Sequence, residues 1–201
     1  MPSIILASAS PRRAGLLEQI GLTFSIQPAE VDETPGPDES PEHYVQRLAR
    51  DKALAVSASA PDSLVLGSDT TVVLDGRILG KPVDADEARA TLARLSGATH
   101  QVMTAVALAR NGGSQCRLVI TEVRFRELSG AEIDAYIATG EPMDKAGSYG
   151  IQERGGIFVN ELRGSYSSVV GLPLQETAAL LEDAGYPVWK HWPSSLESQS
   201  S

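Results

Sequence analysis

The alternation of hydrophobic and polar positions at the start of the chain predicts short strands separated by helices. An apolar run over 3–7 predicts a buried strand. A helix is expected next, because Ser10 is a favourable N-cap residue and Pro11 suits the first helical position. A second strand is expected over 24–27, and the polar, Pro-rich stretch 28–40 is typical of a loop.

The following segment has the pattern of a helix and then a buried strand. Leu48 and Val56 share one face of a helix that we expect over 40–57. The apolar residues 64–66 predict a strand that ends in the polar segment 67–70. A polar side chain in that segment would lie at the carboxyl end of a strand, where α/β sheets usually bind ligands.

The rest of the chain predicts further helices and strands around strong turn signals. Asp75-Gly76 is typical of a tight hairpin turn, and capping-box patterns begin at Asp84 and Ser129. The further elements that we expect are strands over 71–74, 77–79, 101–110, 115–126 and 157–162, helices over 84–95, 129–138 and 172–184, and an irregular segment over 140–156.

This order of elements predicts an α/β fold with a mixed, strongly twisted sheet flanked by helices. The strands over 101–110 and 115–126 are long, and a long antiparallel pair twists strongly. A length of 201 residues suits one domain. We expect residues 1–186 to form that single domain and residues 187–201, with their Ser-rich end, to form a flexible C-terminal tail.

Composition and charge restrict the classes of partner. The 17 Lys and Arg residues against 26 Asp and Glu give a formal net charge of −9, which disfavours duplex nucleic acid but allows a small phosphorylated ligand at a basic cluster. No apolar stretch reaches the roughly 18 residues of a membrane span, and the N-terminus lacks a signal-peptide pattern. The single cysteine, Cys116, fits a reducing cytosol, so we expect a cytoplasmic protein without a membrane partner.

The first cluster of candidate chemistry lies at the start of the first helix. Ser8 and Ser10 supply hydroxyl groups there. Arg12 and Arg13 place two guanidinium groups at the helix N-terminus, where they oppose the helix dipole. A bound anion would remove that conflict, and arginine matches the geometry of phosphate oxygens. The alternative is an ordinary helix start with solvated arginines.

Three more charged residues are candidates for a reaction centre. Lys52 falls on the apolar face of its helix, so its ammonium needs a partner or a ligand, or must reach water. Asp69 could hold Mg²⁺ or orient a water molecule, or it could cap a turn. Glu33, beside Asp32 in the long loop, could be a further oxygen ligand or an ordinary solvated acid.

Two further residues complete the set. Lys81, between Gly80 and Pro82, presents one cation on a rigid turn or is simply an exposed lysine. Gln152, in the irregular segment, could read the edge of a base or belong to a surface connection. The chain contains neither GxxxxGK[ST] nor GxGxxG. Cations together with acids are what cleavage of a nucleotide phosphate chain requires.

In order and spacing, these motifs resemble the Maf family of nucleoside triphosphate pyrophosphatases over about residues 3–184. The matching segments are LASASPRR (6–13), VDE (31–33), RLARDKA (47–53), GSDTTV (67–72), GKP (80–82), LSGATHQVMTAVAL (95–108), GEPMDKAGSYGIQ (140–152) and GSYSSVVGLPL (164–174). The resemblance implies a Maf/ITPase-like fold with two lobes around a central cleft, often in a homodimer. It also implies hydrolysis of a nucleoside triphosphate to the monophosphate and pyrophosphate with a divalent cation, Mg²⁺ or Mn²⁺.

The resemblance also implies roles for particular residues. Asp69 matches the acid proposed in the family as the general base. We expect Glu33 and Asp69 to be the metal ligands. We expect the substrate to be bound by Ser8, Arg12, Arg13, Lys52, Thr70, Lys81 and Gln152.

One subtype of the family prefers dTTP and UTP, and another prefers 7-methyl-GTP. Arg12, Thr70 and Gln152 match the specificity positions of the first subtype, so dTTP and UTP are the expected substrates, with modified pyrimidine nucleotides as further candidates. Glu153 departs from the glycine that usually follows the glutamine in the family, which places a bulky acid in this loop. Two alternatives stay open: a 7-methyl-GTP pyrophosphatase, and a non-catalytic nucleotide-binding regulator of cell division.

Overall fold

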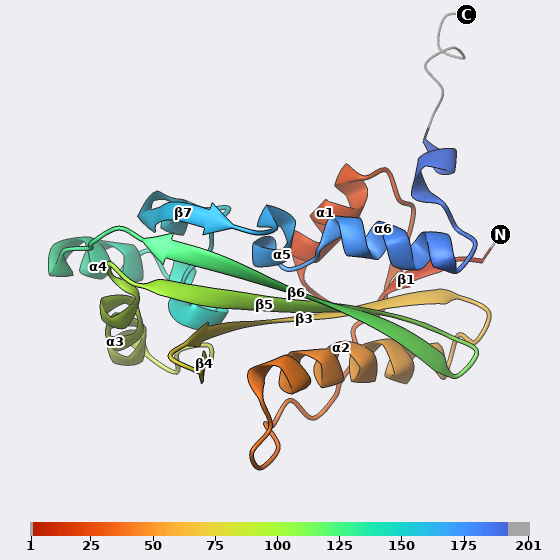
Figure 1. The fold of residues 1–201 in the computed structure, drawn as a ribbon, viewed down its shortest axis with the longest axis horizontal. Coiled ribbons are helices and arrows are strands. Elements are labelled where there is room, and N and C mark those ends of the chain that lie inside the picture. Colours follow the sequence, from red (N-terminus) through yellow and green to blue (C-terminus); the bar gives the residue numbers. More distant parts are fainter. Residues whose placement is uncertain (1, 193–201) are drawn as a thin grey trace, which may run out of the picture.

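A seven-stranded mixed sheet forms the centre of the computed structural model, which describes residues 2–192 (Figure 1). Its order is β2-β1-β3-β5-β6-β7, with β4 paired to β3. β1 is parallel to β2 and β3, and all other pairs are antiparallel, which confirms the expected mixed sheet. The strands are β1 (Ile4–Leu6), β2 (Ser25–Ile26), β3 (Leu64–Leu74), β4 (Arg77–Leu79), β5 (Thr99–Arg110), β6 (Gly113–Phe125) and β7 (Val159–Arg163).

Helices cover both faces of the sheet, as the sequence predicts. α2 lies along one face, α1, α5 and α6 lie on the opposite face, and α3 and α4 lie together at the far end of the long strands (Figure 1). The helices are α1 (Pro11–Gln19), α2 (Pro41–Ser57), α3 (Ala85–Leu95), α4 (Gly130–Ile137), α5 (Tyr166–Val170) and α6 (Leu174–Asp183). The end with α1, α2 and α6 is one lobe, and the end with α3 and α4 is the other.

Alternating side chains of β1 enter two separate hydrophobic cores. Ile4 and Leu6 pack with α1 and α6, whereas Ile5 and Ala7 pack with α2. Successive residues of a strand point to opposite faces, so a strand that is apolar at every position must be covered on both sides. A third core, under α3 and α4, contains Phe125 and Phe158.

Local capping signals in the sequence are confirmed. The Ser10 hydroxyl accepts a hydrogen bond from the Arg13 amide, and Asp84 caps α3 in the same way. Ser129 forms a complete capping box with Glu132 at the start of α4. Each cap satisfies a backbone N–H that the first helical turn leaves without a partner.

The prediction that the third strand stops at residues 67–70 is wrong. β3 continues without interruption from Leu64 to Leu74, because β5 pairs with it from Val65 to Val73. Asp69 therefore lies in the middle of a strand and not at its carboxyl end. It does lie beyond the end of the parallel neighbour β1, whose pairing with β3 stops at Leu66, and the chain after β1 leads into α1.

Other boundaries differ from the prediction because pairing partners decide them. The hairpin between β5 and β6 turns on Asn111 and Gly112 alone, both with positive φ, so β6 begins at Gly113, earlier than expected, whereas β5 ends at Arg110 as expected. The helix expected over 172–184 begins at Leu174, and α5 before it was not predicted. The irregular segment 140–156 contains short 3-10 turns, as its composition suggests.

The chain remains ordered beyond Tyr186, so the expected flexible tail does not begin at residue 187. A 3-10 turn, Val188–His191, follows α6, and Val188 belongs to the core beside α1 and α6. The Trp192 indole N–H donates to the Ile20 carbonyl at 2.7 Å. The rest of the expected tail, residues 193–201, lies outside the described residues.

Candidate active site

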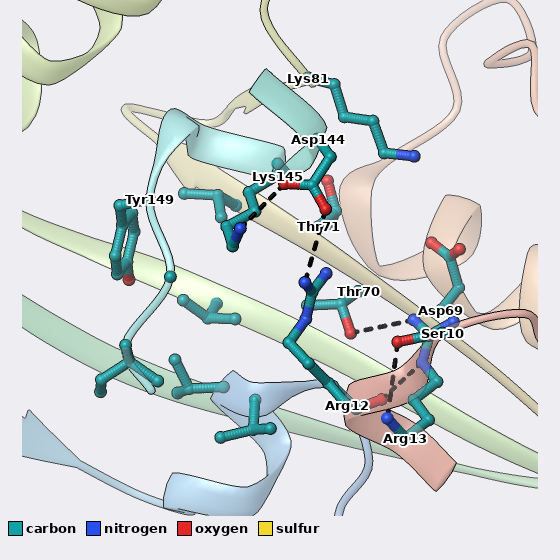
Figure 2. Close-up of a pocket in the computed structure, with 18 of the residues that line it drawn as sticks. Ser10, Arg12, Arg13, Asp69, Thr70, Thr71, Lys81, Asp144, Lys145 and Tyr149 are labelled. Carbon is teal, nitrogen blue, oxygen red and sulfur yellow. Dashed lines mark hydrogen bonds and ion pairs between the residues drawn. The ribbon is translucent and has the colours of Figure 1, made fainter. Parts of the chain in front are cut away.

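A single cavity of about 400 Å³ brings together nearly all of the predicted site residues (Figure 2). It lies between α1 and α2 on one side and the turn after β4 and the segment 144–153 on the other, which confirms a cleft between two lobes. Its lining includes the predicted residues Arg12, Arg13, Glu33, Lys52, Asp69, Thr70, Lys81 and Gln152. Five cationic side chains and four carboxylates line it, a local surplus of positive charge in a chain of net charge −9.

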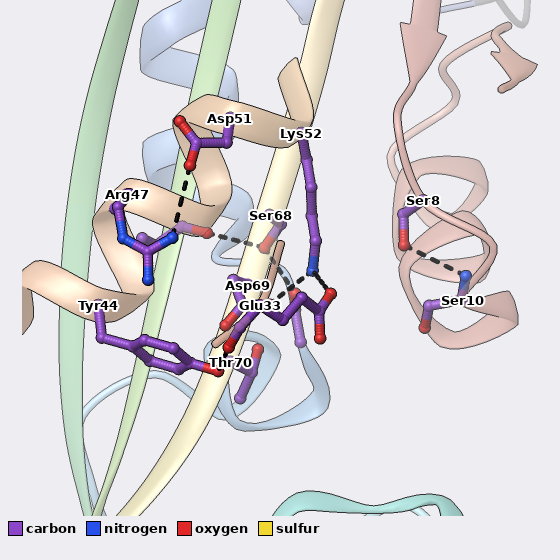
Figure 3. Close-up of polar contacts among 12 residues, drawn as sticks. Ser8, Ser10, Glu33, Tyr44, Arg47, Asp51, Lys52, Ser68, Asp69 and Thr70 are labelled. Carbon is purple, nitrogen blue, oxygen red and sulfur yellow. Dashed lines mark hydrogen bonds and ion pairs between the residues drawn. The ribbon is translucent and has the colours of Figure 1, made fainter. Parts of the chain in front are cut away.

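Two carboxylates converge on the Lys52 ammonium inside this cleft. Its Nζ lies 2.7 Å from Glu33 Oε1 and 2.8 Å from Asp69 Oδ1 (Figure 3). Lys52 is buried on the apolar face of α2, as its spacing predicts, and these acids are the partners that a buried cation needs. The Lys52 hydrogen bond holds the pKa of the Glu33 carboxyl below its usual range.

Close packing of α2 on β3 sets the distance between Lys52 and Asp69. A Cβ at Gly67 would lie 2.4 Å from the Ala49 carbonyl oxygen and 2.7 Å from the Ala53 amide nitrogen. Only glycine allows this approach, so the backbone of α2 comes directly against β3 two residues before Asp69.

Asp69 is only 8% exposed, and burial raises the pKa of its carboxyl above the usual value. The charges of Lys52 and Arg13 oppose that rise. Lys52 bonds Oδ1, and among the described residues no group bonds Oδ2. Asp69 is therefore a buried carboxylate of raised basicity with one oxygen that can accept a proton.

Arg13 reaches three different elements. Its Nε donates to the Gly171 carbonyl at 2.9 Å, its Nη1 to the Ser8 hydroxyl at 3.1 Å, and its Nη2 lies 3.5 Å from Thr70 Oγ1. Burial lowers the pKa of Arg13, but a guanidinium stays charged at any physiological pH. Ser8 itself does not line the cavity, so the structure places it behind Arg13 rather than against a ligand.

Arg12 and Lys81 are the more accessible cations of the cleft. Arg12 Nη1 lies 3.6 Å from the Asp144 carboxylate across the cleft, so it connects α1 to the opposite wall. Lys81 is exposed and extends toward the cavity from the turn after β4 (Figure 2). The Gly80 carbonyl accepts a hydrogen bond from the Gly147 amide, which joins that turn to the segment 144–153 on the same side of the cleft.

The wall that carries Gln152 contains a lysine that the sequence analysis missed. Lys145 is 7% exposed, and its Nζ lies 2.9 Å from the Glu141 carbonyl and 2.8 Å from Asp144 Oδ1. Glu153 Oε1 lies 3.6 Å from the same ammonium. The motif GEPMDKAGSYGIQ contains Lys145, but nothing in its local pattern distinguishes a buried lysine from a surface one.

Thr70 is held by buried hydroxyl groups behind the cleft. Thr104 Oγ1 lies 3.0 Å from Thr70 Oγ1 and 2.7 Å from the Ser168 carbonyl oxygen, and Ser168 belongs to α5. These groups are fully buried and bonded to one another, which fixes the side chains in place. The short helix α5 thus supports both Thr70 and, through Gly171, Arg13.

The donor set of Glu33 and Asp69 fits a divalent cation that arrives with a polyphosphate. Both acids bond one cationic nitrogen, and carboxylate oxygens are the ligands that Mg²⁺ and Mn²⁺ prefer. Within residues 2–192, no group of three or more His, Cys, Asp or Glu side chains could hold a metal ion. Two carboxylates leave room for phosphate oxygens and water, the usual environment of Mg²⁺ in nucleotide enzymes.

Fold and site together define an α/β protein with a cleft for a small polyanion, lined by a buried carboxylate and several cations. The chain belongs to the Maf family: residues 3–184 match the family described as Maf-like protein.

Two curated relatives are similar over nearly the whole chain. A protein of Anaeromyxobacter dehalogenans strain 2CP-1, named dTTP/UTP pyrophosphatase, is 56% identical over 191 residues, which are 93% of this chain and 96% of the relative. A protein of Yersinia pestis with the same name is 57% identical over 182 residues, 90% of this chain and 92% of the relative. Among solved structures, a HAM1 protein from Coxiella burnetii is 17% identical with a TM-score of 0.49, covering 91% of this chain and all of that one.

In the part of the chain that the structure describes, no helix is long and apolar enough to cross a lipid bilayer.

Proposed function

We propose that this chain hydrolyses dTTP and UTP to the nucleoside monophosphate and pyrophosphate. The observation that carries the proposal is the convergence of Arg12, Arg13, Lys52, Lys81 and Asp69 on one cavity. The substrate class is supported by the relatives named dTTP/UTP pyrophosphatase, at 56% and 57% identity.

The cations bind and orient the phosphate chain. Arg13 is fixed by Gly171 and Ser8, so its remaining surface faces the cleft in one orientation. Arg12 is held less firmly, by one ion pair at 3.6 Å, and can exchange Asp144 for a phosphate. Because Lys81 is exposed and extends toward the cavity from the turn after β4, it suits neutralisation of the charge that develops on the departing pyrophosphate.

Asp69 acts as the general base. Its free Oδ2 takes a proton from the water molecule that attacks the α-phosphorus, while the bond from that phosphorus to the α–β bridging oxygen breaks and pyrophosphate leaves. The burial that raises the pKa of Asp69 makes it a stronger base than an exposed carboxylate. Lys52 holds Oδ1 at 2.8 Å, so the carboxyl group keeps one orientation during the transfer.

A divalent metal, Mg²⁺ or Mn²⁺, is part of the proposal, with Glu33 and Asp69 as its protein ligands. When bound, such an ion polarises the phosphoryl oxygens and lowers the pKa of bound water. Lys52 would keep its contacts with the two carboxylates and share them with the ion.

Base selection is assigned to Arg12, Thr70 and Gln152. Thr70 is rigid because Thr104 supports it, and Gln152 presents an amide that can both donate and accept. The preference for dTTP and UTP over 7-methyl-GTP is what the family resemblance implies, because these three residues match the specificity positions of the dTTP/UTP subtype. Two alternatives are tested below: a pyrophosphatase that prefers 7-methyl-GTP, and a nucleotide-binding regulator of cell division without catalytic activity.

The test is release of pyrophosphate from a panel containing dTTP, UTP, CTP and 7-methyl-GTP, with the native chain and with Asp69→Asn. We expect turnover of dTTP and UTP that disappears in the variant while circular dichroism and nucleotide binding persist. Tight binding of dTTP without hydrolysis in Mg²⁺ or Mn²⁺ would support the regulator instead, and preferential turnover of 7-methyl-GTP would support the other subtype.

The proposal includes a cytoplasmic location, on the basis of the single cysteine, and a homodimer, on the basis of the family resemblance. The nucleotide pool and a reduced Cys116 thiol suit the cytoplasm. Sedimentation equilibrium tests the dimer directly. The net charge of −9 supports a free nucleotide, rather than duplex nucleic acid, as the partner.

A further inference from the structure

Three consecutive backbone carbonyls of the loop that carries Glu33 are bonded by two side chains of α2. Arg47 Nη1 donates to the Asp32 carbonyl at 3.3 Å, the Tyr44 hydroxyl donates to the Glu33 carbonyl at 2.9 Å, and Arg47 Nη2 donates to the Thr34 carbonyl at 3.1 Å. Tyr44 extends from α2 toward the backbone of Glu33, and the Arg47 guanidinium lies on the same helix beside Asp51 (Figure 3). The backbone on both sides of Glu33, and its own carbonyl, are therefore fixed to the helix that carries Lys52.

The same guanidinium also holds the far end of the loop. Arg47 Nε lies 2.7 Å from Glu39 Oε1, and Nη2 lies 2.8 Å from Glu39 Oε2, a bidentate pair. Glu39 Oε2 in turn accepts the Gly36 amide at 2.9 Å. Arg47 thus joins both ends of the segment 32–39 through one rigid, five-donor group, which a lysine cannot imitate.

Few other polar contacts fix this loop. Among the described residues, the hydrogen bonds and ion pairs that connect 29–39 to the rest of the chain all go to Tyr44, Arg47 and Lys52. The Glu33 side chain is 55% exposed, so packing alone does not determine where its carboxylate lies. Its position depends on the backbone contacts made by Arg47 and Tyr44.

We propose that Arg47, with Tyr44, is a positioning residue that sets the Glu33 carboxylate beside Asp69. This inference rests on the proposed function only for the role of Glu33. Neither Arg47 nor its partners Asp32, Thr34 and Glu39 line the cleft, so Arg47 acts through the backbone of the loop and not on the substrate.

The test uses Arg47→Lys and Tyr44→Phe, with Arg50→Lys as the matched control. Arg50 lies on the same helix, and its side chain makes no hydrogen bond or ion pair with any residue that the structure describes. Hydrogen exchange of the free protein reports on the loop without substrate. We expect faster exchange over 32–36 in Arg47→Lys, a smaller change in Tyr44→Phe, and native exchange in Arg50→Lys.

The affinity for the divalent metal and the metal dependence of turnover report on the position of the Glu33 carboxylate. The Mn²⁺ affinity of the complex with an uncleavable α,β-imido analogue of UTP is measured by electron paramagnetic resonance. We expect Arg47→Lys to weaken it by about tenfold, the usual effect of losing a group that orients a metal ligand, and to raise the Mg²⁺ concentration for half-maximal turnover by a similar factor.

A double-mutant cycle separates positioning from general stability. The measured quantity is the Mn²⁺ affinity. If Arg47 acts through Glu33, Arg47→Lys changes this affinity very little in a Glu33→Gln background. If Arg47 acts only on folding, the fold-changes of the two single variants multiply in the double variant. Multiplying effects, or native exchange and native Mn²⁺ affinity in Arg47→Lys, would overturn the inference. A native chain that releases no pyrophosphate would contradict the proposed function, while the exchange experiment would still decide whether Arg47 holds the loop.

Discussion

The ammonium of Lys52 lies 2.8 Å from the Asp69 carboxylate, and the two side chains share a buried wall of the cleft. Lys52 thereby keeps a buried acid charged, which a general base requires. Removing one partner of such a pair leaves the other charge uncompensated, which costs more free energy than the pair contributes.

We therefore predict that Lys52→Met lowers the free energy of unfolding, by about 2–3 kcal/mol, because the pair retains slight exposure and the cost for a fully buried pair is higher. The matched variant is Lys81→Met, whose side chain is exposed and forms no ion pair within residues 2–192. It should change stability by less than about 0.5 kcal/mol but still reduce turnover. Urea unfolding measures the stability of both variants. Equal stability of the two variants would contradict the role of the Lys52–Asp69 pair.

Helix caps and the placement of Lys52 could be predicted because each depends on a few neighbouring residues. Ser129 and Glu132 form a capping box from their spacing alone. Lys52 is on the apolar face because helical periodicity places it there, and burial then demands the acids that the structure supplies.

The features that the sequence did not predict depend on contacts between residues far apart in the chain or on the fold of a loop. The continuity of β3 through Asp69 follows from its pairing with β5, which begins some thirty residues later in the chain. The burial of Lys145 follows from the fold of its loop against the Glu141 carbonyl and Asp144. No local pattern contains that information, because a strand end and a surface lysine have the same sequence signals.

Gly67 should tolerate no side chain. An added Cβ would lie 2.4 Å from the Ala49 carbonyl oxygen, and the contact is with helix backbone that cannot move without shifting α2. We predict that Gly67→Ala destabilises the protein by several kcal/mol, about 3 or more, and reduces turnover by separating Lys52 from Asp69. Gly130→Ala is the control, since no atom lies within 4 Å of its added Cβ. Thermal unfolding with native behaviour in both variants would refute the close approach.

Stability should depend on pH through His100. Its imidazole is buried against Phe125 and Tyr149, its Nε2 is 2.8 Å from the Tyr149 hydroxyl, and its Nδ1 has no partner among the described residues. Burial lowers the pKa of His100 to about 4 from the usual 6.5. The unfolded chain therefore binds a proton between these values that the folded chain does not, so stability falls as pH decreases from about 6.5 toward 4.

The expected slope from His100 is about 1.4 kcal/mol per pH unit within that window. His100→Gln removes the titrating group and should flatten the profile between pH 5 and 7, whatever its effect on absolute stability. The Arg47 and Arg126 hydrogen bonds lower the pKa values of the Glu39 and Glu132 carboxyls from the usual 4.5 to about 2. These two groups therefore contribute mainly below pH 4.5 and overlap only the acidic end of the His100 window. Urea unfolding at several pH values gives the slope, and an unchanged slope in His100→Gln would assign it to other groups.

Glu153 places a negative charge in a cleft that has a surplus of cationic side chains. Its carboxylate lines the cavity and lies 3.6 Å from Lys145, which already has Asp144 at 2.8 Å. Glu153→Gln keeps the shape and removes a charge that repels the phosphate chain, so KM for dTTP should fall by about two- to fivefold, a Coulomb effect near 1 kcal/mol or less. Because ions screen such an effect, it should shrink as salt rises from 0.05 to about 0.5 M. A KM that rises in Glu153→Gln would mean that the acid instead orients Lys145 for the substrate, and the loss would then persist at high salt.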